Sequence, residues 1–411
     1  MGRVMYNHWK SEFNPSHMEL RCIPFTPLTS GGILHTLSTS TLDKAPIEAS
    51  TATSSLGSRL KYALLFTGAQ CSFFIGAGIA TGQESLQYFT AHGWWGIVSI
   101  VLVVLLFSWL LSSLTEWGRK NRDNKADPFT DICGKTVGTV LRYCVPVFVF
   151  MIAVTMFAGA GALLNDVLGT PTWVGATGMA VVVAITLMFG FRNLVEIIGR
   201  IGPVIVIVIG IVALWVVVEN FAALADVPEN LAQYQPAKAS ENWFIGTILY
   251  STAILIIAVP FLTSLGREDR SLRSTVRPSI LTGFLYGGVM GLCALALLAT
   301  LPMVYNEATP LVMLGIDLAP WLGYVFSIIT LLGIYSTAAP MLWTVADQFP
   351  LKSRRTYAIV CLALTVVALI GGLKLPFAEL VGFVYPSIGY FGLVFFGCLA
   401  YRQIKSRLAH R

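Results

Sequence analysis

Charged residues are scarce in this sequence. Only 12% of its 411 residues are Asp, Glu, Lys or Arg, whereas 55% are hydrophobic and the mean hydropathy is +0.73. Soluble domains carry roughly 25% charged residues, so the composition excludes an ordinary soluble fold and predicts a protein of the lipid bilayer. Apolar runs recur from Leu60 to Tyr401, which indicates one membrane domain rather than several soluble ones.

Cysteine pairs, histidine clusters and enzyme motifs are also missing. The seven cysteines show no CxxC spacing and the five histidines are scattered, so we predict neither a disulfide nor a transition-metal site. HExxH, GxSxG and Walker motifs are absent, and we therefore expect no enzyme activity. The net charge of +6 does not indicate a nucleic-acid partner, because the basic residues lie between the apolar runs.

Residues 1–58 differ from the rest of the chain. They end in a Ser, Thr and Ala-rich stretch, 37–58, which is typical of disorder. They lack the apolar run of about 7 to 15 residues found in a signal peptide. We expect either a disordered cytoplasmic tail or a translation start assigned too early, followed by a membrane domain over 59–402 and a cytoplasmic tail over 403–411.

Membrane spans follow from the apolar runs, because crossing a core of about 30 Å takes about 20 mostly apolar residues. The first and eighth runs are too long for one straight crossing, and residues 307–320 between spans are expected to form a short outer helix or hairpin. The predicted all-α fold has ten spans, at 60–89, 94–117, 142–165, 172–190, 201–219, 243–265, 279–302, 318–346, 356–373 and 377–400.

Basic residues give these spans an orientation, because Lys and Arg concentrate in cytoplasmic loops. With the N-terminus inside, only Lys238 and Lys374 fall on the opposite side. We therefore predict a multi-pass protein of the cell membrane with both termini cytoplasmic. The basic residues on the cytoplasmic side are Arg59, Lys61, Arg119, Lys120, Arg122, Lys125, Lys135, Arg142, Arg192, Arg200, Arg267, Arg270, Arg273, Arg277, Lys352, Arg354, Arg355, Arg402, Lys405, Arg407 and Arg411.

The first span contains three glycines in FFIGAGIATGQES, residues 73–85. Glycine lowers the cost of leaving helical geometry, so Gly76 and Gly78 mark a place where this helix can unwind. Amides freed near Gly78 would suit a carboxylate, and carbonyls freed over 72–75 would suit a small cation. The alternative is close helix packing, since small residues four apart are common in spanning helices.

The same segment carries a family resemblance. IGAGIATGQE, followed by LQYFTAHGWWG, resembles the first-helix motif of the YkvI-type membrane proteins and, more loosely, the glycine break of the amino acid-polyamine-cation superfamily. The resemblance covers residues 60–400. It implies a LeuT-like fold, in which five helices (about 59–220) are repeated with inverted topology as five more (about 242–402). The first and sixth helices are then broken, and the solute and a coupling ion bind between the repeats.

The sixth span departs from that pattern because no glycine pair lies at its centre. If it is broken, the break would fall at Tyr250, Ser251 and Thr252. The alternative for the two hydroxyls is a hydrogen bond to the preceding turn of their own helix. Under the resemblance, the residues that would contact the solute are Ile75, Gly76, Ala77, Gly78, Tyr250, Ser251 and Thr252.

The eighth span, in LLGIYSTAAPMLWTVADQF, offers the other half of an ion site. Sodium-coupled LeuT-like transporters use two adjacent hydroxyl residues here together with first-helix carbonyls, and oxygen ligands suit a hard cation. Some proton-coupled relatives use a lysine of the fifth helix instead, and residues 201–218 contain none, which favours Na⁺ over H⁺. The alternative is ordinary helix packing. The ion-site residues that the resemblance implies are Ser72, Ile75, Gly333, Ser336 and Thr337.

Glu84 and its neighbour Gln83 are polar residues inside an apolar span. On a straight helix, Glu84 would lie roughly 12 Å beyond the break, still within the half-bilayer of about 15 Å. An acid at that depth is costly and often functional. It could carry a proton, bind a substrate amine or line the outer vestibule, or it could make a structural hydrogen bond to a neighbouring helix.

These features lead to one main functional hypothesis. The sequence predicts a secondary active transporter of a small, amino-acid-like solute, coupled to a Na⁺ or H⁺ gradient by alternating access; no other cofactor is expected. The alternative is a LeuT-like ligand sensor or receptor subunit without transport. An ion channel is less favoured because the sequence has no selectivity-filter repeat or ring of like charges. The sequence does not indicate an oligomeric state.

Overall fold

A computed structural model describes residues 56–124, 126–188, 191–269, 274–349 and 353–409, and these ranges contain helices and no strand. Most of the predicted N-terminal tail lies outside them. In chain order the elements are α2 (Leu56–Phe74), α3 (Ala77–Thr81), α4 (Gln83–Tyr88), η2 (Thr90–His92), α5 (Trp94–Lys120), α6 (Pro128–Leu168), α7 (Thr172–Leu187), α8 (Phe191–Glu219), η3 (Phe221–Asp226), α9 (Val227–Tyr234), α10 (Trp243–Glu268), α11 (Val276–Ala299), α12 (Leu301–Val304), α13 (Pro310–Leu318), α14 (Pro320–Ala346), α15 (Arg354–Lys374) and α16 (Phe377–Ala409).

The predicted membrane-spanning architecture is confirmed. Within the described residues, eight helices are long and apolar enough to cross a membrane: α5, α6, α8, α10, α11, α14, α15 and α16. The first predicted span is present but interrupted, as α2, α3 and α4. The fourth is α7, whose 16 residues are fewer than the about 20 that an untilted crossing takes.

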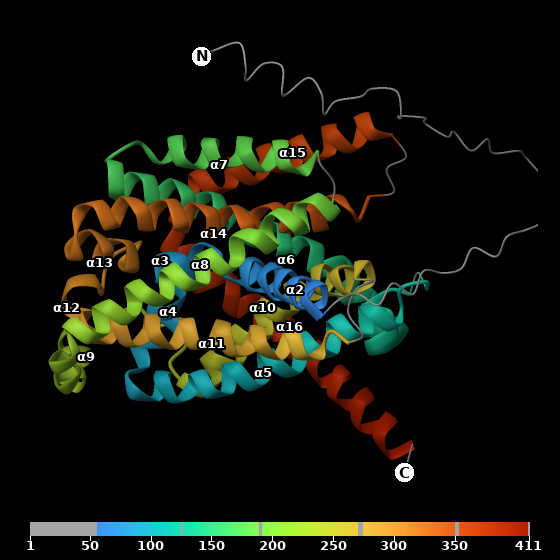
Figure 1. Cartoon of the computed structure of the whole chain (residues 1–411), viewed down its shortest axis with the longest axis horizontal. Coiled ribbons are helices and arrows are strands. Elements are labelled where there is room, and N and C mark those ends of the chain that lie inside the picture. Colours follow the sequence, from blue (N-terminus) through green and yellow to red (C-terminus); the bar gives the residue numbers. More distant parts are fainter. Residues whose placement is uncertain (1–55, 125, 189–190, 270–273, 350–352, 410–411) are drawn as a thin grey trace, which may run out of the picture. The chain divides into compact units, whose positions relative to one another are not determined.

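The long helices form two groups, and the grouping follows the expected five-plus-five repeat (Figure 1). The first two helices of each five pack together: α5 lies against α10 and α11, and α2 lies against α11. The third and fourth of each five form the other group, α6, α7, α14 and α15. The fifth members, α8 and α16, flank them. The groups meet where α2 and α3 contact α14 and α6.

Glycines allow some of these helices to approach closely. A Cβ atom placed on Gly118 of α5 would lie 2.2 Å from the Thr263 carbonyl oxygen of α10, and one on Gly266 of α10 would lie 2.1 Å from the Thr115 carbonyl oxygen. Small residues at such crossings are how spanning helices pack without a hydrophobic driving force. The backbones of α5 and α10 therefore pack closely against each other.

The start of the third span differs from the prediction. The third span was expected at 142–165, but α6 begins at Pro128, after Asp127 accepts a hydrogen bond from the Thr130 amide. A kink at Gly134 (φ 78°) separates its first turns from the rest. Lys135 and Arg142 were assigned to a loop because they are charged, but both lie on the exposed face of α6. The short helix predicted within 307–320 is present as α13.

Candidate functional site

The first span is broken at Gly76, as the sequence predicts, but Gly78, the other glycine expected at the break, lies inside α3. Ile75 and Gly76 separate α2 from α3, and Gly76 has extended backbone angles (φ −87°, ψ −159°). In an unbroken helix the Gly76 and Ala77 amides would bond to the carbonyls of Ser72 and Phe73. Here the Ala77 amide donates instead to the Met156 sulfur, at 3.3 Å. The break therefore frees carbonyls and leaves one amide with a weak acceptor.

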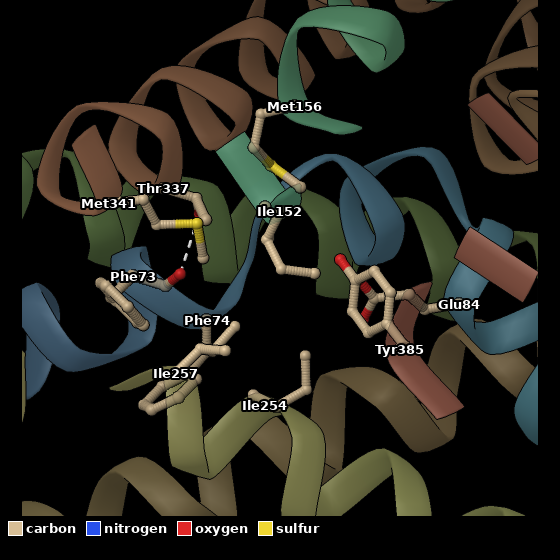
Figure 2. A pocket seen from close by; sticks show the side chains of 11 residues that line it. Phe73, Phe74, Glu84, Ile152, Met156, Ile254, Ile257, Thr337, Met341 and Tyr385 are labelled. Carbon is tan, nitrogen blue, oxygen red and sulfur yellow. Dashed lines mark hydrogen bonds between the residues drawn. The ribbon is translucent and has the colours of Figure 1, made fainter. Parts of the chain in front are cut away.

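The hydroxyl pair, Ser336 and Thr337 of α14, satisfies those carbonyls. Ser336 Oγ donates to the carbonyl oxygens of Ser72 (2.8 Å) and Gly333 (2.9 Å). Thr337 Oγ1 donates to the carbonyl oxygens of Phe73 (2.8 Å) and Ser72 (3.3 Å), and Figure 2 shows the bond to Phe73. The fold thus assembles the residues of the predicted ion site.

The carbonyl of Ile75, the first residue of the break, lies near the same hydroxyl pair. A Cβ atom placed on Gly333 would lie 2.9 Å from the Ile75 carbonyl oxygen. Gly333 thus lets this carbonyl approach α14. Four main-chain carbonyls and two hydroxyls therefore meet at the contact between α2 and α14, where oxygen ligands for a small cation are available.

A second interruption follows at Gly82, whose left-handed conformation (φ 91°) ends α3 after only five residues. This conformation favours glycine. The chain turns there, so Glu84 comes back toward α3 instead of lying farther along a straight helix. The expected 12 Å offset is therefore wrong. A Cβ atom on Gly78 would lie 1.9 Å from Glu84 Oε1, which means that the carboxyl group rests directly on this glycine.

Three tyrosines from three helices surround the Glu84 carboxyl, and we call these four residues the carboxyl cluster. Tyr250 of α10 donates its hydroxyl hydrogen to Glu84 Oε2 at 2.7 Å, and the Tyr286 hydroxyl of α11 lies 2.5 Å from that of Tyr250. Because Tyr250 donates to Glu84, Tyr286 is the donor to Tyr250. The Tyr385 hydroxyl of α16 also interacts with the carboxyl (Figure 2). All four side chains are at most 2% exposed.

A narrow cavity joins the break to the carboxyl cluster (Figure 2), and its enclosed volume of about 10 Å³ has room for about one water molecule. Its polar or small lining residues are Gly76, Glu84, Thr337 and Tyr385. Its apolar lining residues are Phe73, Phe74, Ile152, Met156, Ile254, Ile257 and Met341. The lining comes from both helix groups, so the cavity lies at the contact between them.

The sixth span is not broken. Within the described residues α10 is a single helix from Trp243 to Glu268. Tyr250 reaches the carboxyl cluster, but of the seven predicted solute contacts only Gly76 is among the described residues that line the cavity. The Thr252 hydroxyl donates to the carbonyls of Leu249 (3.1 Å) and Gly389 (2.8 Å), which is the structural alternative for this residue. No glycine pair weakens α10, which is continuous. The buried Ser251 hydroxyl has no partner among the described residues.

Gln83 lies apart from the cavity. Its backbone N–H donates to Thr81 Oγ1 at 3.4 Å, and its buried side-chain Oε1 has no partner among the described residues. The sequence also missed three residues of the site: Tyr286, Tyr385 and Met156. The two tyrosines had a usable signal, because tyrosines concentrate at membrane interfaces and these two lie far inside apolar runs.

No set of three His, Cys, Asp or Glu residues able to hold a metal ion occurs in the part of the chain that the structure describes.

Known proteins support the resemblance seen in the first span. No protein-family model matches the chain. The chain is similar to the uncharacterized membrane protein YkvI of Bacillus subtilis (strain 168), with 23% identity over 359 residues that cover 86% of this chain and 98% of YkvI. It is also similar to the uncharacterized protein YyaD of the same organism, 23% identical over 355 residues, which are 85% of this chain and 98% of YyaD.

Solved structures support the predicted fold. MhsT in complex with L-phenylalanine gives a TM-score of 0.60 at 14% identity, covering 81% of this chain and 87% of MhsT. A manganese transporter of Eremococcus coleocola gives 0.56 at 14% identity, covering 82% and 77%. MHP1, a nucleobase-cation-symport-1 family transporter, gives 0.52 at 12% identity, covering 78% and 74%. This chain therefore has the LeuT-like fold, and over most of its length it is similar to the YkvI-type membrane proteins.

Proposed function

We propose that this protein is a secondary active transporter that carries a small solute by alternating access. The observation that carries the proposal is the break at Ile75 and Gly76, which borders a cavity containing the Glu84 carboxyl. Non-helical backbone at membrane depth is tolerated only where it is buried in protein or lines a cavity. Broken helices of this kind form the solute sites of transporters with inverted repeats.

The two helix groups provide moving parts for this mechanism. Phe73, Phe74 and Gly76 of the first span and Ile254 and Ile257 of α10 line the cavity from one group. Ile152 and Met156 of α6 and Thr337 and Met341 of α14 line it from the other. A rigid-body movement between the groups would open the cavity to one side of the membrane and close it to the other.

Energy for uphill transport would come from an ion gradient, and two sites could couple to it. Na⁺ would bind at the hydroxyl pair, where it would take the place of the hydroxyl hydrogens between Ser336, Thr337 and the carbonyls of the break. H⁺ would bind at Glu84. The absence of lysine from α8 (Phe191–Glu219) agrees with the first alternative. The solute would be small and amino-acid-like, and the movement between the helix groups would have to widen the cavity to admit it, because the enclosed space holds little more than one water molecule.

Purified protein in detergent can test the proposal in two steps. A thermal-shift screen against amino acids, amines and nucleobases, with and without Na⁺, would identify a stabilising ligand. Counterflow of that labelled ligand in proteoliposomes would then establish transport, and imposed Na⁺ or pH gradients would identify the coupling ion. Binding without counterflow would favour the ligand-sensor alternative.

A glycine pair provides the matched variants for this test. A Cβ atom on Gly76 would lie 2.9 Å from Thr337 Oγ1 and 3.0 Å from Met156 Sδ, whereas one on the exposed Gly178 of α7 meets nothing within 4 Å. Gly76→Leu should abolish ligand stabilisation and flux, and Gly178→Leu should retain both. Unchanged binding by Gly76→Leu would refute the proposed site.

A further inference from the structure

The cavity contains one acid and no base. None of its lining residues is Lys, Arg or His, and none of the ion pairs in the described residues involves Glu84. The hydrogen bonds to its carboxyl come from neutral tyrosine hydroxyls, chiefly Tyr250 at 2.7 Å. Hydroxyl donors stabilise a carboxylate, but they leave its charge uncompensated.

The charge of the occupied cavity then depends on the solute. Burying a net charge is costly unless an opposite charge accompanies it. A monocation beside the Glu84 carboxylate makes the cavity neutral. A zwitterion leaves one net negative charge, and an anion leaves two. The cavity is therefore complementary to a cation.

The place that a solute carboxylate would take is already occupied. In a helix that breaks at Gly76, such a carboxylate is expected beside the first amides of α3, near Gly78. The structure puts the protein's own carboxyl there, because Glu84 Oε1 would lie 1.9 Å from a Cβ atom on Gly78. A second carboxylate at this point would face a like charge at short range.

The remainder of the lining suits the body of an organic cation. The rings of Phe73, Phe74 and Tyr385 border the cavity (Figure 2), and aromatic faces attract an ammonium group. Aliphatic and thioether side chains cover most of the other walls. An inorganic divalent cation fits less well, since it needs about six oxygen ligands. The lining side chains with oxygen are Glu84, Thr337 and Tyr385, and the carbonyls of Ser72 and Phe73 are already bonded to the hydroxyl pair.

We propose that the cavity takes a small organic monocation, namely a protonated amine with a compact apolar body and no carboxylate. This inference deepens the proposed function and rests on it, because the cavity is taken as the solute site. Glu84 pairs with the ammonium group, Tyr250 and Tyr286 hold the carboxyl in place, and the aromatic and aliphatic walls contact the body.

Compounds that share a body and differ in charge test the proposal. Full-length protein in detergent is titrated at pH 7 and constant ionic strength with 3-methylbutylamine, leucine and 4-methylpentanoate, which carry a positive, a zero net and a negative charge. A second series uses 2-phenylethylamine, phenylalanine and 3-phenylpropanoate. Dissociation constants come from the ligand-dependent thermal shift. The amine of at least one series should bind at least about tenfold more tightly than its amino acid, and the acids should not bind.

Substitutions of Glu84 separate a charge effect from a folding effect. Glu84→Gln should weaken amine binding at least about tenfold and leave amino-acid binding unchanged or tighter, a reversal that general damage would not produce. Glu84→Asp keeps the charge and should keep the preference for the amine. Glu196→Gln on α8 is the matched control, because Glu196 is half exposed and pairs with Arg200; it should change neither constant.

Three results would overturn the inference: an amino acid that binds more tightly than its amine, no binding by either amine, or amine binding that Glu84→Gln leaves intact. Counterflow of the same compounds distinguishes this failure from failure of the proposed function. An amine that binds without flux would support the cation site and refute the transporter. Leucine that binds more tightly than its amine and shows counterflow would refute the cation site and support the transporter.

Discussion

The contact between Gly78 and Glu84 gives a prediction that can be worked through from the structure. The three atoms nearest to a Cβ on Gly78 all belong to the Glu84 side chain: Oε1 at 1.9 Å, and Cδ and Cγ at 2.2 Å. Gly78→Ala must therefore displace that side chain from its place beside Tyr250. Losing a hydrogen bond to a charged acceptor costs about 1.5–3 kcal/mol, and overpacking adds about 1–3 kcal/mol. We expect a total loss of about 2.5–6 kcal/mol.

The same substitution should be harmless when Glu84 is shortened. Glu84→Ala removes all three of the nearest atoms, and alanine is favoured over glycine in a helix by about 0.5–1 kcal/mol. In that background Gly78→Ala should be neutral or slightly stabilising. The double-mutant cycle should therefore give a coupling energy of at least about 2 kcal/mol.

Equilibrium unfolding of the four proteins in mixed micelles measures this coupling. Gly288→Ala in α11 is the control, because a Cβ atom there meets nothing within 4 Å; its cost should be the same in both backgrounds. Additive effects of Gly78→Ala and Glu84→Ala would refute the placement of the carboxyl on Gly78 and, with it, the turn at Gly82 that brings it there.

Three further predictions concern other parts of the site and its surroundings. Tyr250→Phe removes the donor to Glu84 Oε2 and should lower the free energy of unfolding by about 1.5–3 kcal/mol; Tyr390→Phe, at an exposed tyrosine, should have little effect, and an equal loss in both variants would contradict the role of the cluster. Thr337→Val removes the hydrogen bonds to the carbonyls of Ser72 and Phe73, and any stabilisation of the protein by Na⁺ should disappear with it; an unchanged Na⁺ effect would exclude the hydroxyl pair as the ion site. Burial, then Lys238, lowers the pKa of His92 against the opposing effect of Glu241, so its contribution to stability is complete above the unfolded pKa of about 6.5 and is lost as the pH falls below it. His92→Gln should therefore be less sensitive than the wild type to acidification from pH 7 to pH 5 in a thermal-unfolding series, and parallel curves would refute this.

Hydrogen bonds connect the broken first span to both helix groups. The break frees carbonyls that α14 satisfies through Ser336 and Thr337. The turn at Gly82 returns the Glu84 carboxyl, which α10 contacts through Tyr250. A movement between the groups would therefore change both sets of bonds together. That arrangement could link solute and ion occupancy to the side of the membrane on which the cavity opens.

The predictions from sequence that proved wrong depended on a side-chain contact or on a single backbone angle. A straight-helix rise put Glu84 far from the break, because the left-handed turn at Gly82 is compatible with many other uses of glycine. The sixth span was expected to follow the first, yet α10 is continuous and Thr252 bonds to α16 through the Gly389 carbonyl. The start of α6 was missed because charge on an exposed helical face has the same local appearance as charge in a loop.

The amino-acid sequence by itself determined that the chain lies in a lipid bilayer, roughly how many times it crosses the bilayer, and where the first helix is broken. Apolar length, scarcity of charge and paired glycines are local properties, and the bilayer requires backbone groups to be satisfied within each segment. Only the tertiary structure decided which polar groups share the cavity. Glu84, Tyr250, Tyr286 and Tyr385 come from four separate segments, and their convergence depends on how helices distant in sequence pack together. The charge balance of the cavity, and with it the class of solute proposed for it, follows from that packing.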